Sequence, residues 1–244
     1  MPGQVVDTAS AREFMKEIAA KISPQDLESL VASLVQKSDL FFKVLGEGRA
    51  KEATPQDLTK VLKSIFSSRR RVDKILSLIP PAELALHIDQ LLHGSQNLPE
   101  RFERFNQIFA DFPELSFDLP SEFLHFTYPD QYWLWTRWMW DPRTETGSLT
   151  LVTTEEFDLH ADGRGAAYLK VGEAVAFVSE TGKAVGFTTF GEGLFGLDVY
   201  LACVYSVYMY TVLRLRMSQE FNRIVPQMPS LVRRLLGVHN LEVV

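Results

Sequence analysis

The chain has 244 residues, which is long enough to bury a substantial core as one large domain or two small ones. Its composition, 46% hydrophobic and 23% charged residues, excludes an intrinsically disordered chain. The formal net charge of −6 is opposite in sign to that of a non-specific nucleic-acid binder, so nucleic acid would need a local basic patch. The single cysteine, Cys203, excludes an internal disulfide and a cysteine-based zinc site, and its apolar surroundings indicate an inert thiol.

The start of the chain has neither the basic nor the apolar region of a signal peptide, which predicts a cytoplasmic protein. The most apolar run, residues 199–213, is shorter than the ~20 residues that span a bilayer. It also carries tyrosines in its middle, whereas membrane helices concentrate them at their ends. We therefore expect a buried helix in a soluble protein, with no membrane association.

Three helices are expected in the N-terminal part of the chain. Ser10 and Glu13 have capping-box spacing and predict a helix from this point. Ser-Pro-Gln-Asp at residues 23–26 and Thr-Pro-Gln-Asp at residues 54–57 predict two more, with the hydroxyl residue as N-cap and proline in the first turn. The apolar residues that follow both phrases match, which leaves two explanations open: a duplicated helical unit, or two uses of a good helix start.

The densest basic cluster, Arg69, Arg70, Arg71 and Lys74, is expected at the end of the helix that begins at residue 54. Positive charge stabilises a helix C-terminus, so one interpretation is a solvated last turn. The alternative is contact with nucleic-acid phosphates through Arg69, Arg70 and Arg71. Two further helices are predicted at residues 82–92, stopped by Gly94, and at residues 98–109.

One stretch resembles a known family. Leu-Pro-Glu-Arg-Phe-Glu-Arg-Phe at residues 98–105, an apolar segment from Leu119, and Pro-Asp-Gln-Tyr at residues 129–132 follow one another. This pattern is similar to helical modules related to the 8-oxoguanine DNA glycosylase (helix-hairpin-helix) fold, found in restriction and phage-defence proteins. The resemblance implies a nucleic-acid-associated module. Residues 111–118 lack the glycines of the hairpin, and the catalytic aspartate falls near Thr136, so excision chemistry is not expected.

All four tryptophans lie within residues 133–140, which we call the Trp segment. On a helix, Trp133 and Trp140 would share one face and Trp135 and Trp138 the opposite face. The segment is then either a central core element or, in part, a binding surface with Arg137 and Arg143 beside the indoles. We expect at least one of the two pairs to be fully buried. The candidate binding residues are Trp133, Trp135, Arg137, Trp138, Trp140, Asp141, Arg143 and His125.

Toward the C-terminus, residues 141–147 form a predicted turn and residues 148–153 the best strand candidate. Helices are expected at residues 166–180, with Leu169, Gly172, Val175 and Val178 facing inward, at 198–216, and at 231–236, closed by Gly237. The glycines of residues 186–196 lack the Gly-x-Gly-x-x-Gly spacing of a dinucleotide loop.

These patterns predict a mainly α, multi-helix globular bundle with at most a short β-hairpin. Residues 1–95 would form an N-terminal helical region, and residues 96–244 a helical domain around the Trp segment. We assign no catalytic residue, metal or cofactor, and expect a non-catalytic binding or scaffolding subunit for a protein partner, a ligand or a second copy of the chain. The alternative is a nucleic-acid-associated module in DNA processing or phage defence. An enzyme would need Asp130, Asp141 or His125 in one pocket.

Overall fold

The computed structural model describes residues 5–112, 115–184, 193–216 and 227–239. In this part of the chain eleven α-helices and one 3-10 helix form and no β-strand does, which confirms the mainly α bundle. Two isolated bridges, Val6 with Thr153 and Asp141 with Thr146, are the β-type pairings among the same residues. The second bridge closes the predicted turn at residues 141–147, because residues 142–145 between its two partners are turn residues.

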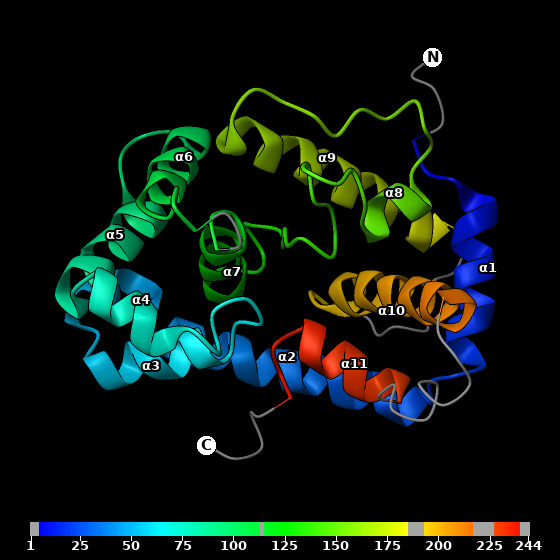
Figure 1. The fold of residues 1–244 in the computed structure, drawn as a ribbon, viewed down its shortest axis with the longest axis horizontal. Helices are drawn as coiled ribbons and strands as arrows, with labels where there is room; N and C mark the ends of the chain where they lie inside the picture. The colour runs from blue at the N-terminus through cyan, green and yellow to red at the C-terminus, as the bar shows by residue number, and fades with distance from the viewer. Residues whose placement is uncertain (1–4, 113–114, 185–192, 217–226, 240–244) are drawn as a thin grey trace.

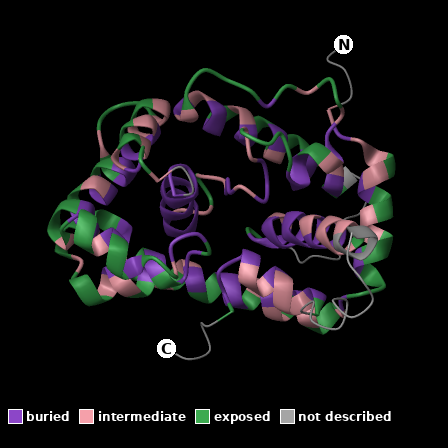
Figure 2. Cartoon of the chain, in the orientation of Figure 1, coloured by how far each residue is buried: buried purple, intermediate pink, exposed green. Residues whose placement is uncertain are grey.

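The helices surround one central helix, α7 (Asp118–Thr127) (Figure 1). The first half of the chain contains α1 (Thr8–Ala19), α2 (Pro24–Leu45), η1 (Gly46–Glu52), α3 (Pro55–Lys63), α4 (Val72–Leu78), α5 (Pro81–His93) and α6 (Leu98–Ile108). The second half contains α7 (Asp118–Thr127), α8 (Ser148–Val152), α9 (Arg164–Ala184), α10 (Gly196–Arg216) and α11 (Met228–Leu235). Every residue of α7 is buried, and α2, α5 and α6 pack against it (Figure 2).

Side-chain caps explain where the early helices begin. Ser23 accepts a hydrogen bond from the Asp26 backbone N–H, and Thr54 with Asp57 forms a complete capping box, so both predicted helix starts are confirmed. The start predicted at Ser10 was wrong. Asp7 caps α1 instead, because its carboxylate accepts from the backbone N–H groups of residues 9 and 10.

The two helices that share this start differ in length. α2 continues for 22 residues and α3 for 9. Their matched positions are buried alike at Leu27 and Leu58 and at Leu34 and Ile65, and are exposed alike at the last pair, Val35 and Phe66. Both the duplication and the simpler explanation remain compatible with this pattern.

Three local predictions were wrong. Arg69, Arg70 and Arg71 do not end a helix, because α3 stops at Lys63 and these residues lie in the turn before α4. Residues 148–152 form the short helix α8 rather than a strand, and only Thr153 makes a β-type bridge. The Trp segment is not helical: after α7 ends, the chain runs through turns and irregular backbone until α8.

The helices expected at residues 82–92, 98–109, 166–180 and 198–216 are confirmed as α5, α6, α9 and α10. On α9, Gly172 and Val178 face inward as predicted, but Leu169 is 39% exposed. Gly237 follows α11 with a positive φ of 75°. Most of the glycine-containing stretch 186–196 lies outside the described residues.

One continuous hydrophobic cluster includes buried residues from both sides of residue 95, for example Phe41 of α2 with Phe123 and Phe126 of α7. The proposed boundary at residue 95 stays a prediction. Among the described residues no single helix is long and apolar enough to cross a bilayer; α4 and α5, bent by 92° at their junction, reach that length and composition only together.

Candidate functional site at the central helix

The buried helix α7 carries a stripe of polar side chains. Asp118, Ser121, Glu122 and His125 are spaced so that they share one helix face, and all four are buried. A buried polar group without a partner is unfavourable by about 1–3 kcal/mol, and more when it is charged. The partners of this face therefore determine how the surrounding elements are positioned.

Lys37 of α2 reaches into the core to meet Glu122. Its side chain is completely buried, and Nζ lies 2.5 Å from Glu122 Oε2. Nζ also donates to the backbone carbonyl of Leu236 at 2.9 Å, just after α11, and lies 3.9 Å from the centre of the Phe126 ring. Burial lowers the pKa of Lys37 and raises the pKa of Glu122, while the attraction between the two charges opposes both shifts.

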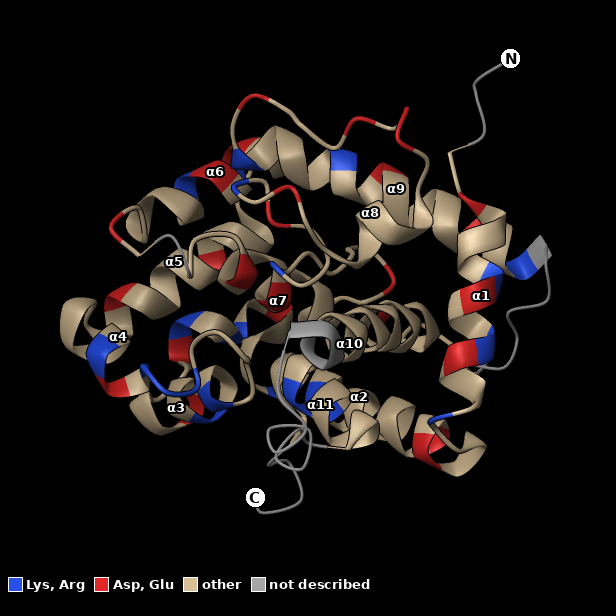
Figure 3. Cartoon of the chain, turned by 45° about the vertical axis from the view of Figure 1, so that its right-hand side comes forward, with Lys and Arg blue, Asp and Glu red and all other residues tan. Residues whose placement is uncertain are grey.

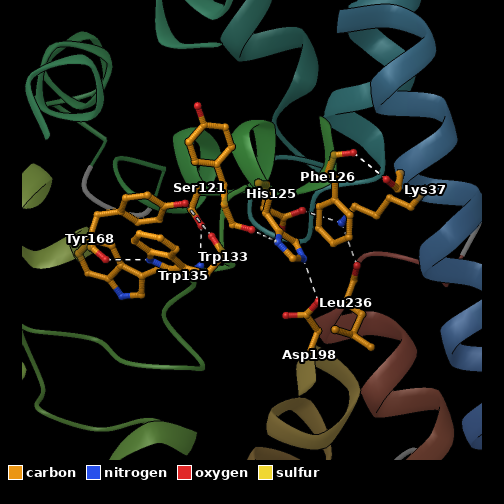
Figure 4. A network of polar contacts seen from close by, with 12 residues as sticks. Lys37, Ser121, His125, Phe126, Trp133, Trp135, Tyr168, Asp198 and Leu236 are labelled. Carbon is orange, nitrogen blue, oxygen red and sulfur yellow. Dashed lines mark hydrogen bonds and ion pairs between the residues drawn. The ribbon is translucent and has the colours of Figure 1, made fainter. Parts of the chain in front are cut away.

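His125 bridges two acceptors (Figure 4). Its Nδ1 lies 2.9 Å from the Tyr132 carbonyl oxygen, and its Nε2 lies 2.8 Å from the Asp198 carboxylate at the start of α10. The carbonyl oxygen can only accept, so Nδ1 donates to Tyr132, and donation from Nε2 to the Asp198 carboxylate at the same time requires the positively charged imidazole. Although burial opposes the charge, Asp198 and the carbonyl raise the pKa of His125 above its ordinary value.

Asp118 begins the same face of α7. One of its oxygens accepts from the backbone N–H of Arg137 at 3.1 Å, and the other lies 3.4 Å from the Arg137 guanidinium. Burial raises the pKa of Asp118 to about 7, because the contact with Arg137 only partly offsets the loss of water. Asp118 is therefore a group that titrates near neutral pH inside the protein.

Hydrogen bonds also fix the Trp segment against α7 and α9. The backbone N–H of Trp135 donates to the Ser121 hydroxyl. The Trp133 indole N–H donates to the Tyr168 carbonyl at 2.8 Å, and the Tyr168 hydroxyl donates back to the Trp133 carbonyl at 2.7 Å, with the two rings stacked (Figure 4). The Trp135 indole N–H donates to the Trp140 carbonyl at 2.9 Å. These polar contacts explain why an irregular segment can lie in the core.

We call the set Lys37, Asp118, Ser121, Glu122, His125, Arg137 and Asp198 the α7 network. It joins α2, α7, the Trp segment and α10, and through Lys37 it reaches the end of α11. Its lysine, histidine and carboxylates are residue types that perform acid–base chemistry. However, each of them is at most 5% exposed, so a substrate has no access to them in this conformation. The arrangement is suited to holding segments together.

The residues singled out from the sequence fall into separate environments. Trp135 and Trp140 are fully buried and Trp138 is 5% exposed, so all three belong to the core, although the two fully buried ones are not a predicted pair. The pairing by helix faces was wrong, because Trp135 stacks on Trp140 in a non-helical segment. Only Trp133 is partly exposed, so a surface role for the other three would require the core to open.

The polar candidates are also dispersed. His125 and Arg137 belong to the α7 network, whereas Asp141 and Arg143 interact with each other in the turn after the Trp segment, 3.8 Å apart. Arg69, Arg70 and Arg71 lie in the turn after α3. Asp130 is exposed, so the three residues that an enzyme would bring together are not in one buried site.

The structure brings together a group that sequence reasoning missed. Phe42 of α2, His93 at the end of α5, and Tyr128 and Tyr132 after α7 form adjoining rings, which we call the aromatic surface cluster. Tyr128 is 6.1 Å from Phe42, 5.8 Å from His93 and 6.5 Å from Tyr132 between ring centres. All four are partly or largely exposed. The Tyr-x-x-x-Tyr spacing was visible in the sequence, but nothing there indicated Phe42 or His93.

Backbone and arginine contacts hold this cluster in place. The N–H of Glu47 donates to the Tyr128 hydroxyl at 2.9 Å, and the N–H of Gly48 donates to His93 at 3.3 Å. Both donors come from η1, where Glu47 and Gly48 have positive φ values of 54° and 78°. The guanidinium of Arg49 lies 5.3 Å from the Phe42 ring centre.

Comparison with known proteins adds no assignment: no family model, curated protein or solved structure matches the chain. Within the described residues, no group of three or more His, Cys, Asp or Glu side chains is arranged to hold a metal ion.

Proposed function

We propose that the chain is a non-catalytic binding or scaffolding subunit that engages a protein partner through the aromatic surface cluster. The observation that carries the proposal is the continuous set of partly or largely exposed rings assembled from α2, α5 and the residues after α7. The cytoplasmic location expected from the sequence is part of the proposal. A second copy of the chain is the other protein that could occupy this surface.

The composition of the cluster supports a protein partner. Tyrosine and phenylalanine are enriched at the centres of protein interfaces, where they bury a large area, and Arg49 beside Phe42 adds a third enriched residue type. The hydrogen bonds from Glu47 and Gly48 already restrain two of the rings before binding. Such pre-organisation lowers the entropic penalty of association.

The alternative, a nucleic-acid-associated module of the helix-hairpin-helix type, has less support. A basic face would need Arg69, Arg70 and Arg71 to join Arg101, Arg104, Arg137 or Arg143, of which Arg104 on α6 is exposed. However, Arg101 donates to the carbonyls that end α5, and Arg137 and Arg143 contact Asp118 and Asp141. In the view of Figure 3, acidic and basic segments are interspersed over much of the molecule. We therefore keep this function as the second candidate.

The chain offers a matched pair of variants to test the proposal. Phe42 is 39% exposed and belongs to the aromatic surface cluster, whereas Phe177 on α9 is 40% exposed and lies outside it. We expect Phe42→Ala to abolish capture of the protein that co-purifies from the native source, or self-association of the purified chain, and Phe177→Ala to leave it intact. Both variants should melt within a few degrees of the unmodified protein.

Quantitative mass spectrometry of the captured proteins and sedimentation of the purified chain provide the two measurements. Loss of the partner with Phe177→Ala but not with Phe42→Ala would reject the aromatic surface cluster as the interface. Capture of DNA, with no protein that depends on Phe42, would favour the second candidate.

A further inference from the structure

A second exposed feature brings together positive charge from two distant parts of the chain. The turn after α3 carries Arg69 and Arg70, and α11 carries Arg234. The two segments are in direct contact, because Gly237 packs so tightly on the Ser64 carbonyl oxygen that a Cβ there would lie 2.0 Å from it. The end of α11 is thereby fixed beside the start of the arginine-containing turn.

Two neighbouring arginines are already engaged by the protein. Arg71 donates to the Ser67 carbonyl at 3.1 Å. Arg233 donates to the hydroxyls of Ser29 and Ser33 at 2.6 and 3.2 Å. The side chains of Arg69, Arg70 and Arg234 make no comparable hydrogen bond to a described residue.

The charge of the remaining three arginines is not balanced locally. Burial lowers the pKa of Arg69, and repulsion from Arg70 and Arg234 lowers it further, while no described carboxylate acts in the opposite direction. The Nε of Arg234 is buried and has no hydrogen-bond partner among the described residues. Arg69 lies 4.8 Å from the centre of the Phe66 ring, which is 37% exposed and orients its guanidinium.

We propose that Arg69, Arg70 and Arg234 form a binding site for a phosphate monoester. Guanidinium groups present paired N–H donors that match the oxygens of phosphate, and clusters of arginine are a recurrent means of recognising phosphorylated groups. A bound phosphate would offset the repulsion among the three charges. It would also accept from donors that the described protein leaves without a partner.

The charges favour a monoester over a nucleic-acid backbone. A phosphate monoester concentrates nearly two negative charges on one group, which suits three cations in one place. A nucleic acid distributes its charges along a chain, and the net charge of −6 on this protein repels such a polyanion at longer range. This site shares no residue with the aromatic surface cluster, so a negative result for one proposal does not affect the other.

Binding of defined probes to the full chain tests the site. The first probe is inorganic phosphate, whose binding is measured by calorimetry. The second is a fluorescent glycine- and serine-rich peptide with one phosphoserine, whose binding is measured by anisotropy with the unphosphorylated peptide as control. A short single-stranded oligodeoxynucleotide is the competing polyanion. We expect Arg69→Gln and Arg234→Gln each to weaken phosphate binding about tenfold, as expected for loss of a charge-assisted contact.

Three further variants separate binding from folding. Arg12→Gln removes an exposed charge on α1 and should leave binding unchanged. Arg70 has an exposed side chain, so Arg70→Gln should fold normally and weaken binding even if Arg69 and Arg234, which are half-buried, do not tolerate substitution. Arg234→Lys keeps the charge but loses the paired donors, and should restore binding only in part.

The outcomes also identify the source of the phosphate. Tighter binding of the phosphoserine peptide than of inorganic phosphate would support the site and assign it to a phosphorylated protein. Equal binding would support the site and assign it to a small phosphate compound. No phosphate binding at millimolar concentration would overturn the proposal. So would phosphate binding that is unchanged in Arg69→Gln, Arg70→Gln and Arg234→Gln, or tighter binding of the oligonucleotide than of either phosphate probe.

Discussion

Lys37 undergoes a large change of environment on folding, because its ammonium group moves from water into contact with Glu122 and the Phe126 ring. Removing a charge from water is unfavourable by several kcal/mol, and a close partner with additional hydrogen bonds recovers much of this loss. The Leu236 carbonyl supplies one such bond. The pair therefore specifies how α2, α7 and α11 meet more than it adds to net stability.

Removing one member of this pair should be worse than removing both. We expect Glu122→Leu to lower the free energy of unfolding by about 3–5 kcal/mol, because the Lys37 charge loses its partner, and the double variant with Lys37→Met to be more stable than either single variant. Urea denaturation of the two single variants and the double variant measures the coupling free energy between Lys37 and Glu122. The exposed pair Lys170 and Glu173, 3.4 Å apart, is the control and should show almost none. Additive effects at Lys37 and Glu122 would contradict the account.

The titration of Asp118 should make the protein less stable as the pH rises toward neutrality. The pKa of Asp118 rises from an ordinary value of 3.8 to about 7 on folding, so between these values the folded state binds more protons than the unfolded state. Stability contributed by such a group falls as the pH rises through this window. His125 acts in the same direction, because its raised pKa stabilises the folded state below the unfolded pKa and that contribution is lost through the folded pKa.

We therefore expect the melting temperature to fall between about pH 5 and about pH 7, and Asp118→Asn to reduce this fall. The exposed Asp130→Asn variant should leave the pH dependence unchanged. An Asp118→Asn variant with the full pH dependence of the unmodified protein would show that Asp118 does not titrate in this window.

At the scale of elements, prediction succeeded where the determinants are local. Ser23 and Thr54 cap their helices with hydroxyls adjacent in sequence to the groups they satisfy, and periodicity located α5, α6, α9 and α10. Residues 148–152 show where such local prediction fails. Their β-branched and apolar residues favour a strand, but no neighbouring strand is present among the described residues to pair with it.

The docking of α9 onto the Trp segment depends on one glycine. A Cβ at Gly172 would lie 2.2 Å from the Trp133 indole. Alanine is favoured over glycine in a helix by about 1 kcal/mol, so an exposed position would gain stability. Here we expect Gly172→Ala to destabilise the protein, because Trp133 must move and lose its hydrogen bond to Tyr168.

Thermal unfolding and tryptophan fluorescence measure this effect. Ser179→Ala, at a half-buried position of α9, is the control and should change neither the melting temperature nor the emission strongly. A more stable Gly172→Ala protein with unchanged tryptophan emission would mean that α9 does not pack on Trp133 as described.

At the scale of the whole molecule, the interactions that organise the core join residues far apart in sequence. The Lys37–Glu122 contact spans 85 positions and the His125–Asp198 contact spans 73. Helical spacing could have shown that Asp118, Ser121, Glu122 and His125 share a face. It could not show that this face is buried, nor which residues form hydrogen bonds and ion pairs with it. The Trp segment escaped prediction for the same reason, since its backbone is held by Ser121 and Tyr168 rather than by its own periodicity.

The central claim is that α7 holds the surrounding segments together through a buried network of charged and hydrogen-bonding side chains. The protonation of His125 tests it most directly, because both ring nitrogens donate to fixed acceptors only if the network is assembled as described. In the full chain labelled with ¹⁵N-histidine, with His125→Gln providing the assignment, we expect both nitrogens of His125 to carry protons at neutral pH. A neutral His125 ring with one unprotonated nitrogen would contradict the account.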